Sequence, residues 1–285
     1  MKKIIFVCTG NTCRSPMAEG LFHKYLRERN LDFISVKSAG LSAAVGLPPT
    51  DNAVAAAKEL GADISAHRSN ALTQYNFEKD IYFICMTASH AAVLRQFVGK
   101  ERIMTLDVPD PYMGDLSVYR FAAEKIVSQF DAVFHFVFGC LPPRTMRQGD
   151  VSAVAEIENV CFSHPWTAAG LAEETENPTA RFFIAASEEK TVAYIGANNI
   201  AGEVYITNIA VLPAYRQRGI GELLLSYLLS VSEKERAEFV TLEVRESNQT
   251  AIRLYEKLGF IKCGLRKHFY RDPEEDALIF THNFN

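Results

Sequence analysis

The chain of 285 residues lacks several features that would define its class at once. No apolar run approaches the ~20 residues that a membrane-spanning helix needs, so we expect no membrane partner. The Lys2-Lys3 pair is followed only by a short apolar run and a polar loop, which is not the pattern of a signal peptide. Six cysteines are scattered without a CxxC pair or a His/Cys cluster, so no metal site is predicted. These absences favour a cytoplasmic protein.

The whole chain has a net charge of −4, and the negative charge is concentrated in its second half. Residues 1–145 contain 16 Lys and Arg against 14 Asp and Glu, whereas residues 146–285 contain 14 against 20. An acidic second half argues against nucleic acid as its partner and suits a basic substrate.

The first half alternates short apolar runs with helical patterns. We expect strands at Ile4–Val7, Phe33–Ser38, Ile81–Met86 and Arg102–Leu106, and helices at Pro16–Arg29, Asp51–Leu60, Ala88–Phe97 and about Ser117–Phe138. Ser15 is placed to cap the first helix, with Pro16 at its first position. This alternation predicts an α/β fold with a parallel sheet covered on both faces, whose active site lies at the carboxyl ends of the strands.

The segment Leu141-Pro142-Pro143-Arg144 breaks this pattern and predicts a linker, so we expect one domain at 1–140 and another at 146–285. In the second domain we expect helices at Val151–Cys161, Gly219–Ser232 and Gln249–Leu258, and strands at Arg181–Ala186, Thr191–Asn198, Glu203–Val211, Phe239–Val244, Phe260–Gly264 and Ala277–His282. The order predicts a second α/β domain with antiparallel strands first and a βαβ unit later, and therefore a mixed sheet.

The strongest motif is the loop Cys8-Thr9-Gly10-Asn11-Thr12-Cys13-Arg14-Ser15, between the first strand and the first helix. Backbone N–H groups of such a loop can surround one anion, and Arg14 adds a two-pronged contact to phosphate oxygens. The helix N-terminus and Arg14 favour the thiolate of Cys8. The pattern indicates a nucleophile aimed at a phosphate ester, with Asn11 holding the loop through its side-chain amide.

Cleavage of a phosphoester by a thiolate also needs a proton for the leaving group. Asp110 is the candidate acid, because Pro111 stiffens the backbone beside its carboxylate in the loop that ends at Gly114. The same carboxylate can later activate the water that hydrolyses a phosphocysteine. Ser15 can donate a hydrogen bond to the thiolate and make it a better leaving group in that step.

Residues 1 to about 140 resemble a low-molecular-weight protein-tyrosine phosphatase, through the Cys8–Ser15 loop and the Asp110-Pro111-Tyr112 signature. The resemblance implies that Cys8 is the nucleophile, Arg14 the phosphate clamp, Ser15 the donor to the thiolate and Asp110 the acid. It implies substrate-binding roles for Thr9, Gly10, Asn11, Thr12, Cys13 and Tyr112. It also implies that Cys13 can form a reversible disulfide with Cys8 under oxidation.

The substrate is left open between phosphoarginine and phosphotyrosine in a phosphorylated protein. Tyrosine-directed members of the family usually carry a larger aliphatic residue where this chain has Thr12, and the threonine resembles the arginine-directed branch. Tyr112, by contrast, is common in the tyrosine-directed group. Thr12 favours phosphoarginine, because a small hydroxyl residue leaves room for a guanidinium-like leaving group and can polarise it.

In the second half, Arg216-Gln217-Arg218-Gly219-Ile220-Gly221 stands between an expected strand and an expected helix. Successive N–H groups of such a loop can face a pyrophosphate. Together with Thr207–Pro213, Leu242–Asn248 and Leu254–Phe260, this loop resembles the GNAT family of acetyl-CoA-dependent N-acetyltransferases. The Cys161–Trp166 segment is similar to the subfamily that acetylates a ribosomal-protein alanine, which implies a ribosomal protein N-terminus as partner.

The second resemblance implies roles for individual residues. Glu243 is then the base that deprotonates the ammonium and Tyr255 the acid that protonates the departing thiolate. Acetyl-CoA would be bound by Val211, Arg216, Gln217, Arg218, Gly219, Ile220, Gly221 and Asn248. Two alternatives stay open: either domain could serve only as a binding module, or the acetyltransferase could act on a small-molecule amine beside a strictly phosphotyrosine-directed phosphatase.

Overall fold

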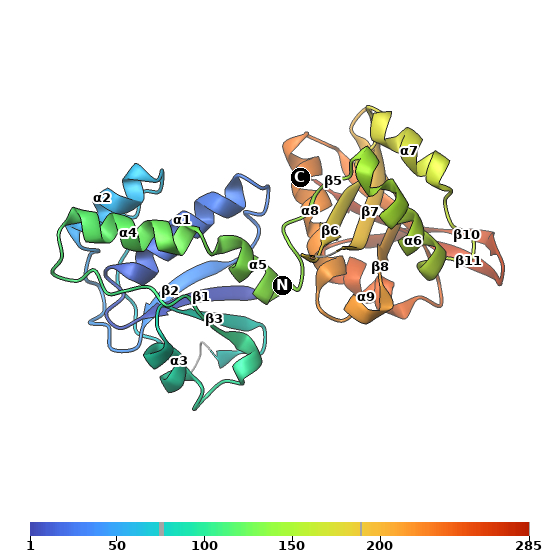
Figure 1. Cartoon of the computed structure of the whole chain (residues 1–285). Helices are drawn as coiled ribbons and strands as arrows, with labels where there is room; N and C mark the ends of the chain where they lie inside the picture. Colours follow the sequence, from blue (N-terminus) through green and yellow to red (C-terminus); the bar gives the residue numbers. More distant parts are fainter. Residues whose placement is uncertain (74–76, 189, 285) are drawn as a thin grey trace. The chain divides into compact units, whose positions relative to one another are not determined.

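The computed structural model describes residues 1–73, 77–188 and 190–284. The chain divides into two compact units, Met1–Phe138 and Gly139–Asn285, which are labelled along the chain in Figure 1. Each unit is an α/β structure with its own sheet, as the sequence predicted. None of the helices in the described ranges is long and apolar enough to cross a membrane.

The first unit is built on a parallel sheet with strand order β2-β1-β3-β4. Its strands are β1 (Lys3–Cys8), β2 (Val36–Gly40), β3 (Ile81–Cys85) and β4 (Ile103–Thr105). Its helices are α1 (Arg14–Arg27), α2 (Asp51–Glu59), α3 (Ala88–Leu94), α4 (Leu116–Val127) and α5 (Phe130–Phe138). The central strand β1 ends at Cys8, which therefore lies at the carboxyl edge of the sheet.

Helices cover both faces of this sheet, and alternate side chains of β1 point to one face and the other. Ile5 and Val7 pack in one apolar cluster with Ala91 and Leu94 of α3. Phe6 points the other way and meets the ring of Phe22 on α1 edge-on. In Figure 1, α3 lies on one side of the sheet, and α1, α2 and α4 lie on the other.

The prediction of a single helix over 117–138 is wrong, because the helix is interrupted between Val127, where α4 ends, and Phe130, where α5 begins. Ser128 Oγ donates to the carbonyl of Lys125 at 3.0 Å. Gln129 Nε2 donates to the same carbonyl at 2.9 Å and to the carbonyl of Leu106, in a distant loop, at 3.0 Å. These side chains bond backbone carbonyls at the end of α4, so a new helix starts after them.

The second unit contains a mixed sheet of strand order β10-β11-β9-β8-β7-β6-β5. Its strands are β5 (Arg144–Thr145), β6 (Phe183–Ala186), β7 (Thr191–Ile200), β8 (Glu203–Val211), β9 (Phe239–Arg245), β10 (Ile261–Arg271) and β11 (Glu274–Asn283). Its helices are α6 (Val151–Cys161), α7 (Ala168–Glu176), α8 (Ile220–Lys234) and α9 (Gln249–Lys257). The pairing of β8 with β9 is parallel and the other pairings are antiparallel.

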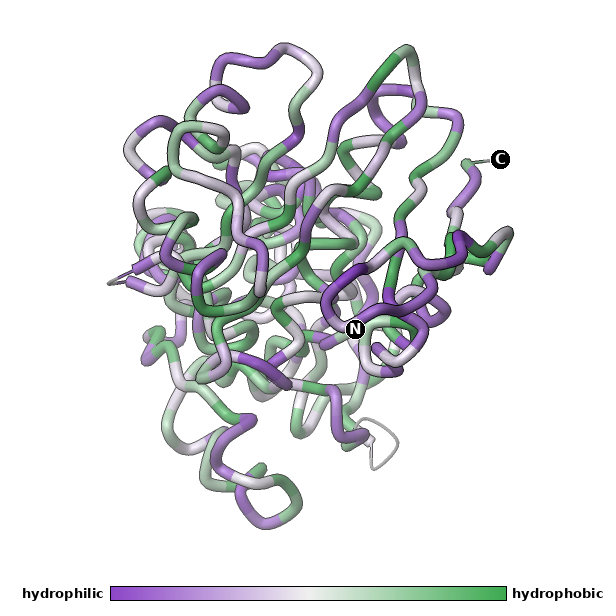
Figure 2. The backbone as a smooth tube through the Cα atoms, turned by 90° about the vertical axis from the view of Figure 1, so that its right-hand side faces the viewer, coloured by the Kyte–Doolittle hydropathy of each residue, from purple (hydrophilic) through white to green (hydrophobic). Residues whose placement is uncertain are grey.

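The second sheet is also covered on both faces. Phe182, Ile184 and Tyr194 pack in one cluster with apolar residues of α6 and α7. Phe183 points to the opposite face and meets the ring of Tyr227 on α8 edge-on. Figure 2 shows hydrophobic and hydrophilic stretches alternating along the backbone.

The structure corrects three expectations in this unit. The segment predicted as a linker contains the short strand β5, which pairs with β6 through Arg144 and Ile184. Helix α7 was not predicted, although Thr167 caps it by accepting a hydrogen bond from the N–H of Gly170 at 3.1 Å. Strand β10 continues past the predicted end at Gly264 to Arg271. The prediction stopped early because the later residues are mostly exposed and show no apolar alternation.

Candidate active sites

The loop from Cys8 to Ser15 joins β1 to α1 and is held by Asn11. Asn11 is fully buried and has a positive φ of 55°, a left-handed conformation that asparagine tolerates better than most residues. Its Nδ2 donates to Ser15 Oγ at 2.9 Å and to Ser38 Oγ at 2.8 Å, and its Oδ1 accepts from the N–H of Asn70 at 2.7 Å. Both the NH₂ group and the oxygen of the Asn11 side chain therefore hold the loop in place.

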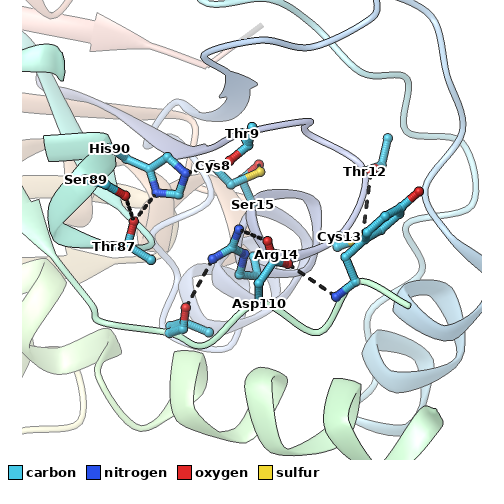
Figure 3. Close-up of polar contacts among 12 residues, drawn as sticks. Cys8, Thr9, Thr12, Cys13, Arg14, Ser15, Thr87, Ser89, His90 and Asp110 are labelled. Carbon is cyan, nitrogen blue, oxygen red and sulfur yellow. Dashed lines mark hydrogen bonds and ion pairs between the residues drawn. The ribbon is translucent and has the colours of Figure 1, made fainter. Parts of the chain in front are cut away.

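Cys8 and Ser15 lie together under this loop, with Cys8 Sγ 2.9 Å from Ser15 Oγ (Figure 3). Ser15 already accepts a hydrogen bond from Asn11, so its own O–H can point at the sulfur. The backbone N–H of Asn11 donates to the sulfur as well, at 3.2 Å. The predicted capping role of Ser15 is wrong, because α1 begins at Arg14 and Cys13 is its N-cap. The Ser15 side chain serves the sulfur instead.

The backbone of the same loop forms a cradle of hydrogen-bond donors. Within the described residues, no acceptor takes the N–H groups of Thr9, Gly10, Thr12, Cys13, Arg14 and Ser15. Several of these groups lie at the start of α1, where the helix dipole adds positive potential. Free donors in a loop above a thiol are suited to the oxygens of a phosphoryl group.

Arg14 and Asp110 meet beside this cradle. Arg14 Nη2 donates to Asp110 Oδ2 at 2.7 Å, and Nη1 donates to the carbonyl of Val108 at 3.2 Å (Figure 3). The Arg14 side chain is 5% exposed and the Asp110 side chain 55% exposed. Asp110 Oδ1 also accepts from the N–H of Tyr112, whose side chain is exposed. The predicted clamp and the predicted acid are thus in direct contact, and Tyr112 lies at the surface next to them.

Thr12 and Cys13 lie on the other side of the loop. Thr12 is half-buried; its carbonyl accepts from the N–H of Thr50 at 3.0 Å, and its Oγ1 lies 3.7 Å from Cys13 Sγ. Cys13 is buried, with its sulfur 3.5 Å from both Thr50 Oγ1 and Tyr119 OH. Burial raises the pKa of Tyr119 to about 12, with a further contribution from its hydrogen bond to Cys13.

His90 is a further residue of this site that sequence reasoning did not find. Its Nε2 lies 2.9 Å from Thr9 Oγ1 and its Nδ1 lies 2.7 Å from Thr87 Oγ1 (Figure 3). Burial lowers the pKa of His90, and the nearby Arg14 guanidinium lowers it further. A single histidine in a helical pattern gave no signal, because Thr9 and His90 are far apart in the sequence.

In the second unit, the candidate site lies where β8 and β9 separate. The two strands pair from Glu203 and Phe239 only as far as Tyr205 and Thr241. Beyond that point a cavity of about 490 Å³ is lined by both strands, by α9, by Tyr270 of β10 and by the end of α6 with the segment after it. Of the predicted residues, Glu243, Asn248 and Tyr255 line this cavity.

Glu243 and Tyr255 differ in environment. The Glu243 side chain is 28% exposed and pairs with Arg266, with 3.1 Å between Oε1 and Nη1. Tyr255 is buried, and burial raises its pKa, so its hydroxyl stays protonated at neutral pH. One side chain can thus accept a proton in this cavity while the other can donate one. Asn248 caps α9 by accepting a hydrogen bond from the N–H of Ala251 at 3.1 Å.

The loop 216–221 forms a second anion cradle. Within the described residues, the N–H groups of Gln217, Arg218, Gly219, Ile220 and Gly221 donate to no acceptor. Gln217 and Gly219 have positive φ values of 61° and 85°, which turn the chain into α8. Arg216 points back and donates from Nε to the carbonyl of Val211 at 3.0 Å. These donors are suited to the oxygens of a pyrophosphate, and the hydrogen bond of Arg216 ties the start of the loop to Val211.

The buried carboxylate of Glu158 on α6 was also not found from the sequence. It is fully buried and accepts hydrogen bonds from Tyr194 OH, from Asn208 Nδ2 at 2.9 Å and from the N–H of Trp166 at 2.7 Å. Asn208 and Trp166 also line the cavity. A glutamate in an amphipathic helix is ordinarily expected at the surface, so the sequence carried no signal for it.

The first unit thus places a thiol beside loop N–H groups that can bind an anion, and the second places a separated strand pair in the same unit as another such loop. The family model for low molecular weight phosphotyrosine protein phosphatase matches residues 3–137, and the model for the acetyltransferase (GNAT) family matches residues 151–260. The chain belongs to both families, one in each unit.

Relatives of each unit carry names that state an activity. A protein-arginine-phosphatase of Geobacillus stearothermophilus is 36% identical over 45% of this chain and 91% of its own length. A [ribosomal protein bS18]-alanine N-acetyltransferase of Escherichia coli (strain K12) is 34% identical over 48% of this chain and 93% of its own length. An N-alpha-acetyltransferase of Sulfurisphaera tokodaii is 33% identical over 48% of this chain and 89% of its own length.

Proposed function

We propose that the chain is a bifunctional enzyme in which a cysteine-dependent protein phosphatase precedes an acetyl-CoA-dependent N-terminal acetyltransferase. The observation that carries the first activity is the position of Cys8 beside a loop in which six N–H groups find no acceptor among the described residues, with Ser15 as a donor to its sulfur. The observation that carries the second is the cavity that Glu243, Tyr255 and Asn248 line, in the unit that also contains the loop 216–221.

In the phosphatase reaction, the Cys8 thiolate attacks phosphorus and a sulfur–phosphorus bond forms as the bond to the leaving group breaks. The leaving group takes the proton of Asp110, while Arg14 and the loop N–H groups stabilise the charge on the phosphoryl oxygens. Asp110 then removes a proton from water, the water oxygen attacks phosphorus, and the thiolate of Cys8 leaves. Ser15 stabilises that thiolate through its hydrogen bond.

We favour phosphoarginine in a protein as the substrate. Thr12 is a small hydroxyl residue of the loop, and its carbonyl accepts a hydrogen bond from the N–H of Thr50. A small side chain at this position leaves more room for a guanidinium-like leaving group than a larger aliphatic side chain would. The similarity to the Geobacillus stearothermophilus protein-arginine-phosphatase supports this choice. Phosphotyrosine is the competing substrate, favoured by the exposed ring of Tyr112 beside the acid.

In the acetyltransferase, bound acetyl-CoA supplies an activated acetyl group to an amine. Glu243 accepts a proton from the acceptor ammonium, directly or through one water. Tyr255 keeps its proton at neutral pH, as a tyrosine ordinarily does, and burial raises its pKa further, so it holds a proton for the departing sulfur. The loop 216–221 and Asn248 hold the cofactor. The similarity to the Escherichia coli ribosomal-protein alanine acetyltransferase supports a ribosomal protein N-terminal alanine as acceptor.

Two experiments test these assignments. The first compares kcat/KM for a phosphoarginine peptide and a phosphotyrosine peptide of the same sequence; we expect the larger value for phosphoarginine, and the reverse order overturns that preference. The second incubates an alanine-starting ribosomal peptide and a polyamine with acetyl-CoA and follows both by mass spectrometry. We expect an added acetyl group at the peptide N-terminus, whereas acetylation of the polyamine alone would assign a small-molecule acceptor.

A further inference from the structure

A buried carboxylate lies behind one wall of the acetyltransferase cavity. Glu158 on α6 is fully buried, and it accepts hydrogen bonds from donors in three other segments. They are Tyr194 OH on β7, Asn208 Nδ2 on β8 and the N–H of Trp166 in the segment after α6. A buried carboxylate is costly unless its lone pairs are satisfied, so these three groups are fixed in place by it.

This contact determines which way the Asn208 amide faces. Asn208 Nδ2 donates to Glu158 Oε1 at 2.9 Å, so the group that the amide turns toward Glu158 is its NH₂. The carbonyl oxygen of the same amide then points away from Glu158. Asn208 lines the cavity, and its Oδ1 accepts no hydrogen bond from the part of the chain that the structure describes. Nor is this oxygen a buried atom without a partner, so it is open to the cavity.

We propose that Asn208 Oδ1 accepts a hydrogen bond from the α-amino group of the acceptor and that Glu158 is the positioning residue that keeps this oxygen facing the cavity. The inference rests on the proposed N-terminal acetyltransferase and names a residue that recognises its acceptor. Asn208 lines the same cavity as Glu243, the proposed base. An ammonium has three N–H groups; when Glu243 takes one proton, the others still need acceptors in the cavity.

The chemistry of an amide oxygen suits this task. It accepts a hydrogen bond without removing the proton, so it orients the nitrogen and leaves the proton transfer to Glu243. Glu158 also fixes the backbone of Trp166, a second residue of the cavity wall. One buried carboxylate therefore sets both the amide and the adjoining segment before the acceptor binds.

The test is a binding cycle on the full-length protein saturated with coenzyme A. Titration calorimetry compares an alanine-starting peptide with the same peptide lacking its α-amino group, for the unchanged protein and for Asn208→Ala. We expect the unchanged protein to prefer the amino peptide by about tenfold or more, as for one hydrogen bond to a charged group. In Asn208→Ala this preference should fall by about tenfold, leaving only the part that Glu243 contributes, with the affinities for the desamino peptide and for coenzyme A unchanged.

Glu158→Gln tests the positioning role. Glutamine has one acceptor oxygen where the carboxylate has two, so it cannot satisfy Asn208 and Trp166 at once. We expect a smaller loss of the preference for the amino peptide, with affinity for coenzyme A retained. Asn199→Ala is the matched control, because Asn199 Nδ2 donates to Glu235 at 2.9 Å and Asn199 is not among the residues that line the cavity.

The outcomes separate the inference from the proposed function. If Asn208→Ala keeps the full preference for the amino peptide, the inference is wrong, whether or not the peptide is acetylated. If Asn199→Ala loses the preference as strongly as Asn208→Ala, the effect is structural and the inference is also wrong. Absence of acetylation of the alanine-starting peptide by the unchanged protein would instead overturn the proposed function.

Discussion

Arg14 Nη2 lies 2.7 Å from Asp110 Oδ2, so the guanidinium that would bind phosphate is paired with the carboxylate that would protonate the leaving group. Arg14 is buried and also held by the carbonyl of Val108, whereas the carboxylate of Asp110 is largely exposed. We expect a phosphoryl group bound at Arg14 to take the place of this carboxylate and to release Asp110 toward the leaving group. On the proposed function, the pair would then link substrate binding to the availability of the acid.

The first prediction concerns Asp110 as the acid. Asp110→Asn should lower the rate of the first turnover by roughly 10²–10⁴-fold on phenyl phosphate, because its leaving group needs a proton. The loss should be much smaller on dinitrophenyl phosphate, whose leaving group is already a stable anion. Stopped-flow measurement of the first turnover over a series of aryl phosphates checks this. Asp107→Asn is the control, since Asp107 has a positive φ of 53° that asparagine adopts readily. Equal losses on all leaving groups would contradict the acid role.

The second prediction is that the two activities can be separated, because each unit has its own reactive groups. Cys8→Ser should abolish phosphatase turnover and leave acetylation unchanged. Glu243→Gln should do the reverse. Both assays are run on the same folded preparations, with p-nitrophenyl phosphate and an alanine-starting peptide as substrates. Loss of both activities from either substitution would show that the sites are not independent.

The third prediction assigns the leaving-group preference to Thr12. Thr12→Ile should shift the ratio of kcat/KM values toward phosphotyrosine by roughly tenfold or more, because the larger side chain fills space and removes the hydroxyl. Thr12→Ser keeps the hydroxyl and should keep the ratio near that of the unchanged protein. The ratio is measured on phosphoarginine and phosphotyrosine peptides of one sequence. A ratio that Thr12→Ile leaves unchanged would remove the reason to favour phosphoarginine.

The fourth prediction concerns pH and His90, whose pKa is lowered by burial and by Arg14. An unfolded histidine titrates near pH ~6.5, so below that value the unfolded chain binds a proton that the folded chain does not. Stability of the first unit should therefore fall as pH drops from about 6.5 toward the lower folded pKa. His90→Asn should make this fall shallower. Hydrogen exchange of the β1 amides between pH 7 and 5 measures it, and identical slopes would contradict the prediction.

The fifth prediction concerns Gly40, at the end of β2 under the phosphate loop. A Cβ at this position would lie 2.5 Å from the carbonyl oxygen of Thr9 and 2.8 Å from Ala43 Cβ. Gly40→Ala should therefore destabilise the first unit by about 1–3 kcal/mol and weaken inhibition by inorganic phosphate. Gly149→Ala, where a Cβ would meet nothing within 4 Å, should leave both unchanged. Hydrogen exchange and phosphate inhibition are the measurements. An undisturbed phosphate affinity would show that the loop does not depend on this contact.

Several elements were predictable because their signals are local. The predicted bounds of Val151–Cys161 and Glu203–Val211 agree with α6 and β8. Cys8, Asn11 and Ser15 are close in sequence, so a strand followed by a helix brings them together. The same holds for the loop 216–221, which enters α8 directly. Such features depend on neighbouring residues and on backbone geometry, which a sequence displays.

The sequence by itself therefore determined two α/β units, a thiol in a loop that can bind phosphate and a second loop that can bind pyrophosphate. Only the tertiary structure decided that Arg14 pairs with Asp110, that His90 contacts Thr9 and that Glu158 orients Asn208. It also ended α4 where Gln129 reaches the carbonyl of Leu106. The physical reason is common to all four: each contact joins segments distant in the chain, and a buried polar group finds its partner only when the fold brings that partner to it.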